Sequence, residues 1–82
     1  MADKSYAKAA RDALAAAMAE DDAVYAVGED IGRGGVFGQY AGLKDRFGPD
    51  RVMDSPISEA TIMGSAVGAA LMGLRPVVEM RI

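Results

Sequence analysis

The chain has 82 residues, 51% of them hydrophobic, and 9 Lys and Arg side chains against 12 Asp and Glu give a formal net charge of −3. A chain of this length forms at most one small domain, which buries about 60–65% of its unfolded surface. It contains neither Cys nor His, so disulfides and thiolate metal sites are excluded and the commonest general base is missing, while the acidic balance gives nucleic-acid binding no support.

The first half of the chain predicts a helix, a strand and a second helix. Residues 6–19 are rich in Ala, and apolar side chains recur there at three- and four-residue spacing, which predicts a helix. Residues 23–27 form a short apolar run with several β-formers, which predicts a buried strand. Five glycines among residues 28–38 predict a loop, and residues 40–47 are predicted as a short helix.

The second half continues the alternation. Residues 51–53 are predicted as a strand, and residues 59–72 as a helix with Ser58 as its N-cap and Gly73 as its stop. Residues 76–82 predict a third strand. Helix–strand alternation of this kind predicts the α/β class, with a parallel sheet, flanking helices and right-handed crossovers. Because the last apolar strand pattern runs to the final residue, we expect a truncated domain.

The longest apolar run, residues 60–74, is too short to span a bilayer and contains several glycines. The first residues of the chain lack the basic and apolar regions of a signal peptide. We therefore expect a cytoplasmic protein that does not interact with a membrane.

Carboxylates at two places are candidates for function. Glu59 stands at the predicted start of an apolar helix, where it is either a favourable partner of the helix dipole or a functional group. Glu29 and Asp30 follow the first predicted strand, at the carboxyl end where open α/β sheets bind ligands. The alternative for these two acids is that they are solvated loop residues.

Two glycine patterns favour structural explanations. Residues 32–38 resemble a dinucleotide-binding fingerprint but have Phe37 where the third Gly belongs, and no long helix opens from them, so a flexible loop is favoured. Gly64 and Gly68 form a Gly-x-x-x-Gly pair, which predicts close packing of the third helix on another helix or on the sheet.

Taken together, the motifs resemble the N-terminal part of the β subunit of thiamine-diphosphate-dependent 2-oxo acid dehydrogenases, the E1 β subunit of pyruvate, branched-chain and acetoin dehydrogenase complexes. The matching segments occur in the family's order and cover nearly the whole chain. They are Val27-Gly28-Glu29-Asp30-Ile31-Gly32, Gly34-Gly35-Val36-Phe37-Gly38, Gly42-Leu43, Phe47-Gly48, Arg51-Val52, Asp54-x-Pro56-Ile57-Ser58-Glu59 and Gly73-Leu74-Arg75-Pro76-Val77-Val78-Glu79. The resemblance implies that residues 1–82 are the N-terminal portion of a transketolase-like pyrimidine-binding domain, with no second domain.

The resemblance also implies roles for three residues. The family's cofactor-binding glutamate falls on Glu59, whose carboxyl group would hydrogen-bond ring nitrogen N1′ of thiamine diphosphate and favour the imino tautomer. The exocyclic nitrogen could then take the proton from thiazolium C2. Glu29 falls on an acid that, in the family, belongs to an acidic passage between paired active sites. Ile57 either lines the pyrimidine pocket or fills core as a turn residue.

The rest of the family's site lies elsewhere. Magnesium and the diphosphate are held by a Gly-Asp-Gly motif of the E1 α subunit, and this chain has no such motif. The implied partners are the α subunit, in an α2β2 assembly, and the lipoyl-bearing E2 core. The parent reaction would be oxidative decarboxylation of a 2-oxo acid, or acetoin cleavage, with acyl transfer to lipoamide. The chain alone is expected to be inactive.

The sequence leaves two further points open. Residues 35–38 and 56–60 are slightly more similar to acetoin and pyruvate members than to branched-chain members, but they do not identify the substrate. The alternative function is a non-catalytic interaction or structural module that self-associates or docks on a partner.

Overall fold

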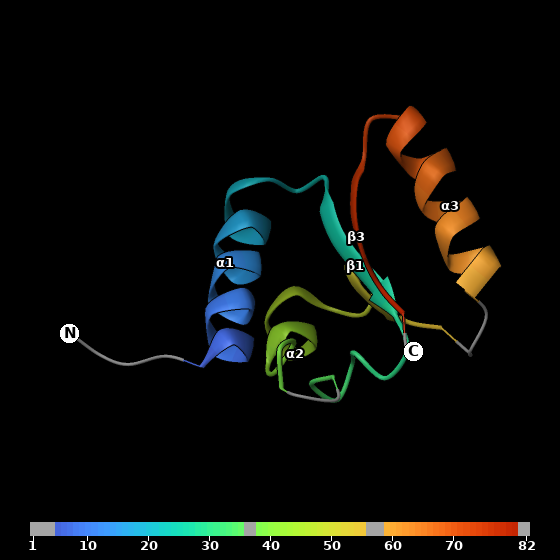
Figure 1. The fold of residues 1–82 in the computed structure, drawn as a ribbon. Helices are drawn as coiled ribbons and strands as arrows, with labels where there is room; N and C mark the ends of the chain where they lie inside the picture. The colour runs from blue at the N-terminus through green and yellow to red at the C-terminus, as the bar shows by residue number, and fades with distance from the viewer. Residues whose placement is uncertain (1–4, 36–37, 56–58, 81–82) are drawn as a thin grey trace.

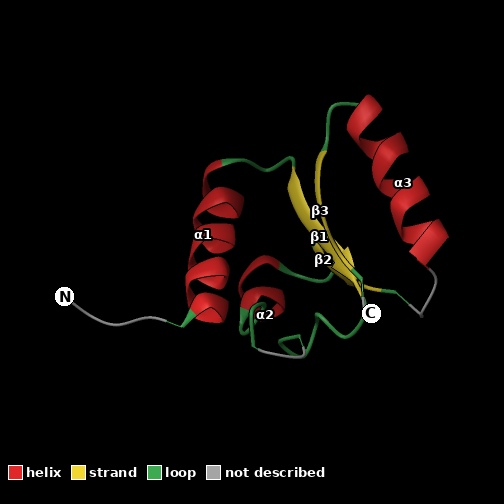
Figure 2. Ribbon diagram, in the orientation of Figure 1, coloured by secondary structure: helices red, strands yellow, loops and turns green. Residues whose placement is uncertain are grey.

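A computed structural model of the chain describes residues 5–35, 38–55 and 59–80. Its elements, in chain order, are helix α1 (Tyr6–Glu20), strand β1 (Val24–Gly28), helix α2 (Leu43–Phe47), strand β2 (Val52–Asp54), helix α3 (Glu59–Leu71) and strand β3 (Arg75–Glu79). The three strands are parallel and lie in the order β2-β1-β3, so β1 is central. The predicted α/β fold with a parallel sheet and flanking helices is confirmed (Figures 1 and 2).

The helices cover the two faces of the sheet unequally. Helices α1 and α2 lie on one face and α3 lies on the other (Figure 1). The main hydrophobic core fills the space between α1, α2 and the sheet. Its buried members are Ala15, Met18, Val24, Ala26, Ile31, Tyr40, Leu43 and Val52. The buried side chains of α3 are Ile62 and Ala66, one turn apart, so this helix rests on the sheet along a narrow strip.

Two elements, α2 and β3, have a boundary that differs from the sequence prediction by more than one residue. Helix α2 begins at Leu43 and not at residue 40, because Gly42 precedes it with φ +78°, outside the helical region. Strand β3 begins at Arg75 and ends at Glu79, whereas the prediction ran from residue 76 to residue 82; residues 81–82 are outside the described part. The predicted N-cap Ser58 also lies outside the described residues.

The predicted close packing of Gly64 and Gly68 is wrong for this structure. A Cβ atom placed on either glycine would meet no atom within 4 Å. Both residues lie on the exposed side of α3, because the contact with the sheet is made by Ile62 and Ala66.

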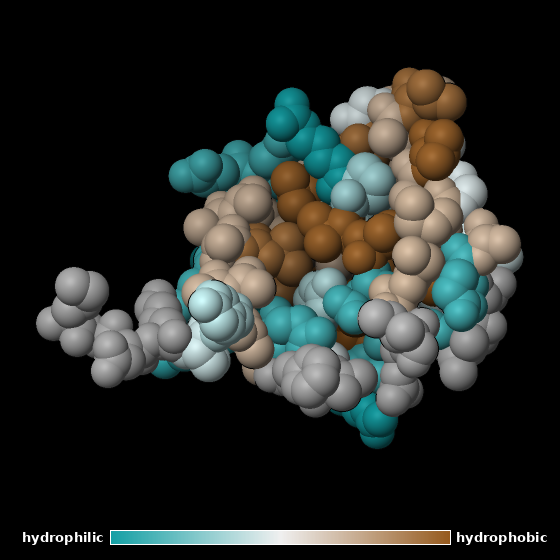
Figure 3. All heavy atoms as spheres, in the orientation of Figure 1, coloured by the Kyte–Doolittle hydropathy of each residue, from teal (hydrophilic) through white to brown (hydrophobic). Residues whose placement is uncertain are grey.

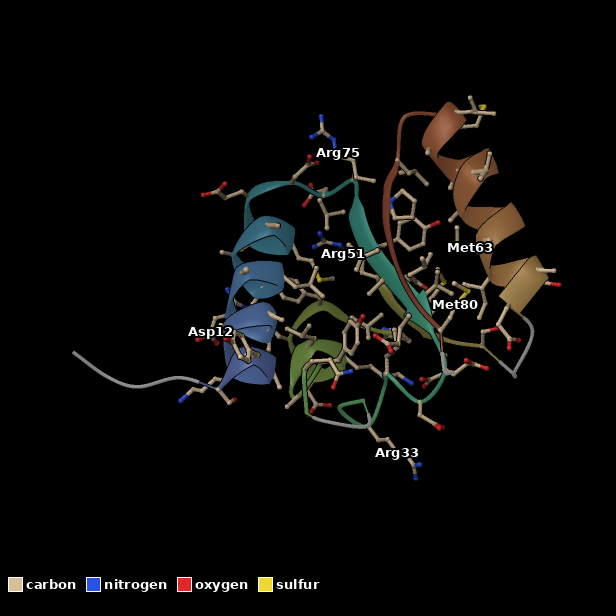
Figure 4. The ribbon with its side chains drawn as sticks, in the orientation of Figure 1. Asp12, Arg33, Arg51, Met63, Arg75 and Met80 are labelled. Atoms are coloured by element: carbon tan, nitrogen blue, oxygen red, sulfur yellow. The ribbon has the colours of Figure 1, made fainter. Side chains whose placement is uncertain are left out.

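Arg51 joins the first half of the chain to the second. Its Nη2 group donates to the carbonyl oxygens of Met18 (2.7 Å), Asp21 (2.9 Å) and Val24 (2.9 Å). These carbonyls belong to the last turns of α1 and the start of β1, where helix carbonyls lack intrahelical partners. The guanidinium also lies 5.1 Å from the centre of the Phe47 ring. Figure 4 shows the side chain reaching into the space between α1 and the sheet.

We expect Arg51→Lys to lower the free energy of unfolding by about 1–3 kcal/mol, because an ammonium group cannot reach three carbonyls and stack on a ring at once. Arg46→Lys is the matched control, since Arg46 is exposed and lies over the same ring at 4.8 Å. Urea unfolding of the two variants side by side provides the measurement. Equal midpoints would contradict the role given to Arg51.

In the part of the chain that the structure describes, no helix has the length and apolar character needed to cross a membrane.

Candidate functional site at the carboxyl edge of the sheet

The carboxyl ends of the three strands meet at one edge of the sheet. Gly28, the last residue of β1, is paired in register with Asp54 of β2 and Glu79 of β3. The first turn of α3 lies at the same end of the sheet (Figure 1). Ligands of open parallel sheets bind at this edge, so the acids gathered here form the candidate site.

Glu29 is buried at this edge. Its exposed fraction is 2%, so the interpretation of Glu29 as a solvated loop acid is wrong. Asp30 is half-buried, adopts a left-handed backbone conformation with φ +61°, and lies 3.7 Å from the Arg33 guanidinium. Burial of a carboxyl group is costly and is typical of functional positions, which favours the ligand-edge interpretation for Glu29.

Glu59 is the first residue of α3, as predicted, and its side chain is exposed. An acid in the first turn interacts favourably with the helix dipole, and an exposed carboxyl group is accessible to a ligand. The position is thus compatible with both interpretations of Glu59. Its role on the cofactor stays a prediction. Ile57 lies outside the described residues.

Sequence reasoning missed two side-chain interactions at this edge. Asp54 accepts a hydrogen bond from the Gly32 N–H at 2.7 Å, and the hydroxyl of Tyr40 donates to Glu79 Oε1 at 3.0 Å. Asp54 and Glu79 are each the last residue of a parallel strand. An acid at the end of a predicted strand is the sequence signal that could have pointed to them.

Strands β1 and β3 approach each other closely at Gly28. A Cβ atom on Gly28 would lie 2.5 Å from Cβ and 2.6 Å from the carbonyl oxygen of Glu79, so no larger residue fits without moving β3. The absence of a side chain on Gly28 thus lets Glu79 pair closely with β1, where the Tyr40 hydroxyl reaches its carboxyl group. The backbone of Glu79 is therefore held by strand pairing, and its carboxyl group is held by the hydrogen bond from Tyr40.

Tyr40 has an environment that favours its neutral form. Burial raises the pKa of the Tyr40 phenol well above its ordinary value of 10.0, and the hydrogen bond to Glu79 and that carboxylate's charge raise it further. The folded state thus binds the phenolic proton more tightly than the unfolded chain does. Above about pH 10 the free energy of unfolding falls as pH rises, because only the unfolded chain releases this proton.

We expect alkaline titration of tyrosinate absorbance to show one of the three tyrosines ionising late, together with unfolding. Tyr40→Phe should remove that late phase. Tyr6→Phe is the control, because Tyr6 is 97% exposed, and it should leave the late phase in place. A late phase that survives Tyr40→Phe would contradict the assignment.

Two surface hollows lie elsewhere. One, of about 250 Å³, is at the amino end of the sheet and is lined by Asp22, Ala23, Tyr25, Asp50, Arg51, Met53 and Leu74. The other, of about 470 Å³, lies between α1 and the loop before α2 and is lined by Ser5, Ala7, Lys8, Arg11, Gly38 and Ala41. Neither hollow is lined by Glu29 or Glu59. The candidate site is therefore not one of these hollows, and we place it at the carboxyl edge of the sheet because the acids gather there.

The comparison with protein families identifies the class. Residues 2–81 match the family described as transketolase, pyrimidine binding domain. The chain belongs to this family, whose match covers nearly its whole length.

Curated relatives include β subunits of two kinds of dehydrogenase. The 2-oxoisovalerate dehydrogenase subunit beta of Bacillus subtilis (strain 168) is 47% identical over 78 residues, which cover 94% of this chain and 24% of that protein. A pyruvate dehydrogenase E1 component subunit beta of Staphylococcus epidermidis is 44% identical over 82 residues, 99% of this chain and 25% of that protein. The mitochondrial pyruvate dehydrogenase E1 component subunit beta-1 of Oryza sativa subsp. japonica is 48% identical over 73 residues, 88% of this chain and 20% of that protein.

The chain thus spans about a quarter, or less, of the length of these relatives. Their names include both 2-oxoisovalerate and pyruvate dehydrogenases at similar identity, so they do not favour the predicted lean toward acetoin or pyruvate members. Among the described residues, no group of three or more His, Cys, Asp or Glu side chains is placed to hold a metal ion.

Proposed function

We propose that this chain contributes the aminopyrimidine-contacting part of a thiamine-diphosphate-dependent 2-oxo acid dehydrogenase, as a portion of its E1 β subunit. The observation that carries the proposal is the placement of Glu59, exposed at the start of α3 and at the carboxyl edge of the sheet. The family match and the names of the relatives support it.

The Glu59 carboxyl group is suited to one edge of an aminopyrimidine ring. An exposed carboxyl group at the first turn of a helix can form a hydrogen bond to a ring nitrogen, and the start of α3 limits where that group can move. When bound, thiamine diphosphate supplies the nucleophilic carbon for attack on a 2-oxo group. The part of Glu59 is to share a proton with N1′ and so to favour the imino form of the ring.

Glu29 has a second role in this proposal. Its burial next to the end of β1 fits a carboxyl group that passes protons inside an assembly and not one that meets bulk solvent. We assign Glu29 to an acidic passage between paired active sites. Ile57 is assigned to the wall of the pyrimidine pocket.

The proposal includes partners that complete the site. An E1 α subunit would supply the magnesium and diphosphate ligands, in an α2β2 assembly, and a lipoyl-bearing E2 core would accept the acyl group. The names of the relatives, which are β subunits of 2-oxoisovalerate and pyruvate dehydrogenases, support a 2-oxo acid as substrate. Acetoin remains a candidate to be assayed beside them.

We expect Glu59→Gln in the assembled αβ enzyme to lower turnover by about 10²–10⁴, because the amide keeps the shape but cannot exchange a proton with N1′. The melting temperature should stay nearly unchanged. If Glu59 only interacts with the helix dipole, the same change would cost about 0.3–1 kcal/mol of stability and little activity. Turnover and melting temperature are measured on one preparation.

Two variants control this experiment. Glu20→Gln makes the same change at the exposed last residue of α1 and should leave turnover unaltered. Glu29→Gln should give a milder loss than Glu59→Gln. Full activity of the Glu59→Gln enzyme would end the catalytic assignment.

The exposed face of α3 favours the second candidate function, a module that self-associates or docks on a partner. Its apolar side chains Val67 and Leu71 are 57% and 82% exposed, and Met72 just beyond is 85% exposed. Figure 3 shows this apolar surface over the end of α3. Glu59 is the one charged residue of the helix, so two such faces would meet without like-charge repulsion along most of their length. Apolar patches of this kind mark interaction sites.

We expect the chain to show concentration-dependent association in sedimentation velocity, and Leu71→Lys to weaken it by placing a charge in the contact. Ala16→Lys is the control, because it adds the same charge at an exposed position of α1. A monomer that melts cooperatively at every concentration would rule out self-association through this face.

A further inference from the structure

Asp54 connects the loop after β1 to the end of β2. Its Oδ1 accepts the hydrogen bond from the Gly32 N–H at 2.7 Å, and its Oδ2 lies 3.5 Å from Lys44 Nζ of helix α2. Hydrogen bonds to an ionised acceptor are shorter and stronger than neutral ones. One carboxylate therefore contacts two segments that are distant from it in sequence.

The packing around Gly32 is shaped by this carboxylate. A Cβ atom on Gly32 would collide with the carboxylate oxygen of Asp54 and would lie 3.1 Å from Lys44 Cδ. The loop backbone thus approaches Asp54 as closely as a residue without a side chain allows.

A second hydrogen bond anchors the other end of the same loop. The N–H of Ser55 donates to the carbonyl oxygen of Gly28 at 2.8 Å, one residue beyond the β1–β2 pairing. Asp54 and Ser55 therefore hold the loop at Gly28 and at Gly32, and Glu29 lies between these two points. Ile31, which has an exposed fraction of 0%, fixes the middle of the loop in the core.

We propose that Asp54 is a positioning residue that holds the loop bearing Glu29 against the end of β2, five residues before Glu59 in the sequence. The catalytic meaning of this positioning rests on the proposed function, whereas the anchoring of the loop does not. Asp54 provides the acceptor, Lys44 orients the second oxygen, and Gly32 provides the space.

The test uses the assembled αβ enzyme with Asp54→Ala, Asp54→Asn and Gly32→Ala chains. Asp50→Ala is the matched control, because Asp50 is an exposed aspartate just before the opposite end of β2. Two quantities are measured: turnover with the KM for the 2-oxo acid, and hydrogen exchange of the peptide that covers residues 29–35.

For Asp54→Ala we expect faster exchange in residues 29–35 and a fall in kcat of about 10–100-fold with little change in KM, because a small misplacement of the acids costs rate. Asp54→Asn keeps an acceptor oxygen and should recover most of both quantities. Gly32→Ala disrupts the same contact from the loop side and should resemble Asp54→Ala. If the Asp54→Ala chain does not assemble, the Gly32→Ala enzyme provides the test of the anchoring. Asp50→Ala should match the unmodified enzyme.

Unchanged exchange in residues 29–35 of both Asp54→Ala and Gly32→Ala would overturn the proposal. An Asp54→Asn enzyme that is as slow as Asp54→Ala, with the loop still protected, would also overturn it, because the charge and not the anchoring would then matter. If Glu59→Gln retains activity while Asp54→Ala still loosens the loop, the proposed function fails and the anchoring stands.

Discussion

The guanidinium group of Arg51 is the contact on which the arrangement of this chain depends. It satisfies carbonyl oxygens at the end of α1 and at the start of β1 from the residue just before β2, so it fixes where two of the three strands begin. Strand β1 is central, and both neighbours take their register from it. In a parallel sheet, the position at which strands begin and their length decide which residues meet at the carboxyl edge. The contact at the amino end thus helps to align Asp54 with Gly28 at the other end, while Glu79 is aligned by the pairing of β3 with β1.

That edge is stabilised by polar contacts between strand ends and loop, beside Ile31 and Tyr40, which are buried in the main hydrophobic core. Asp54 contacts the Gly32 N–H, Tyr40 contacts Glu79, and Ser55 continues the ladder to Gly28. Burial of Glu29 at this edge has a desolvation cost that a purely structural loop would avoid by placing the acid in solvent. This is the physical reason to interpret the edge as a site.

Much of the fold could be predicted from the sequence, because its signals are local. The Ala-rich spacing of α1 and the apolar run of β1 each lie within one segment, and their boundaries agree with the structure to within a residue. The start of α2 could not be predicted, since the left-handed conformation of Gly42 is set by the turn around it. The hydrogen bond of Asp54 with Gly32 and that of Arg51 with Met18 join residues 22 and 33 positions apart, and no pattern in a single sequence reports such pairs. Burial of Glu29 was missed for the same reason.

Helix α3 carries both a candidate site residue and an exposed apolar face. It carries Glu59 on its first turn, yet its own chain buries only Ile62 and Ala66 among the described residues of that helix. A helix that is apolar on most of its surface is stable when both sides are covered. The remaining face, with Gly64, Val67, Gly68 and Leu71, offers small and large apolar groups but no charge to specify an orientation by itself. An occupant of that face would therefore limit the motion of α3 and of Glu59 with it. Covering that face and placing the carboxyl group precisely would then be the same physical event, and this is how an exposed Glu59 would meet the fixed geometry that the proposed site requires.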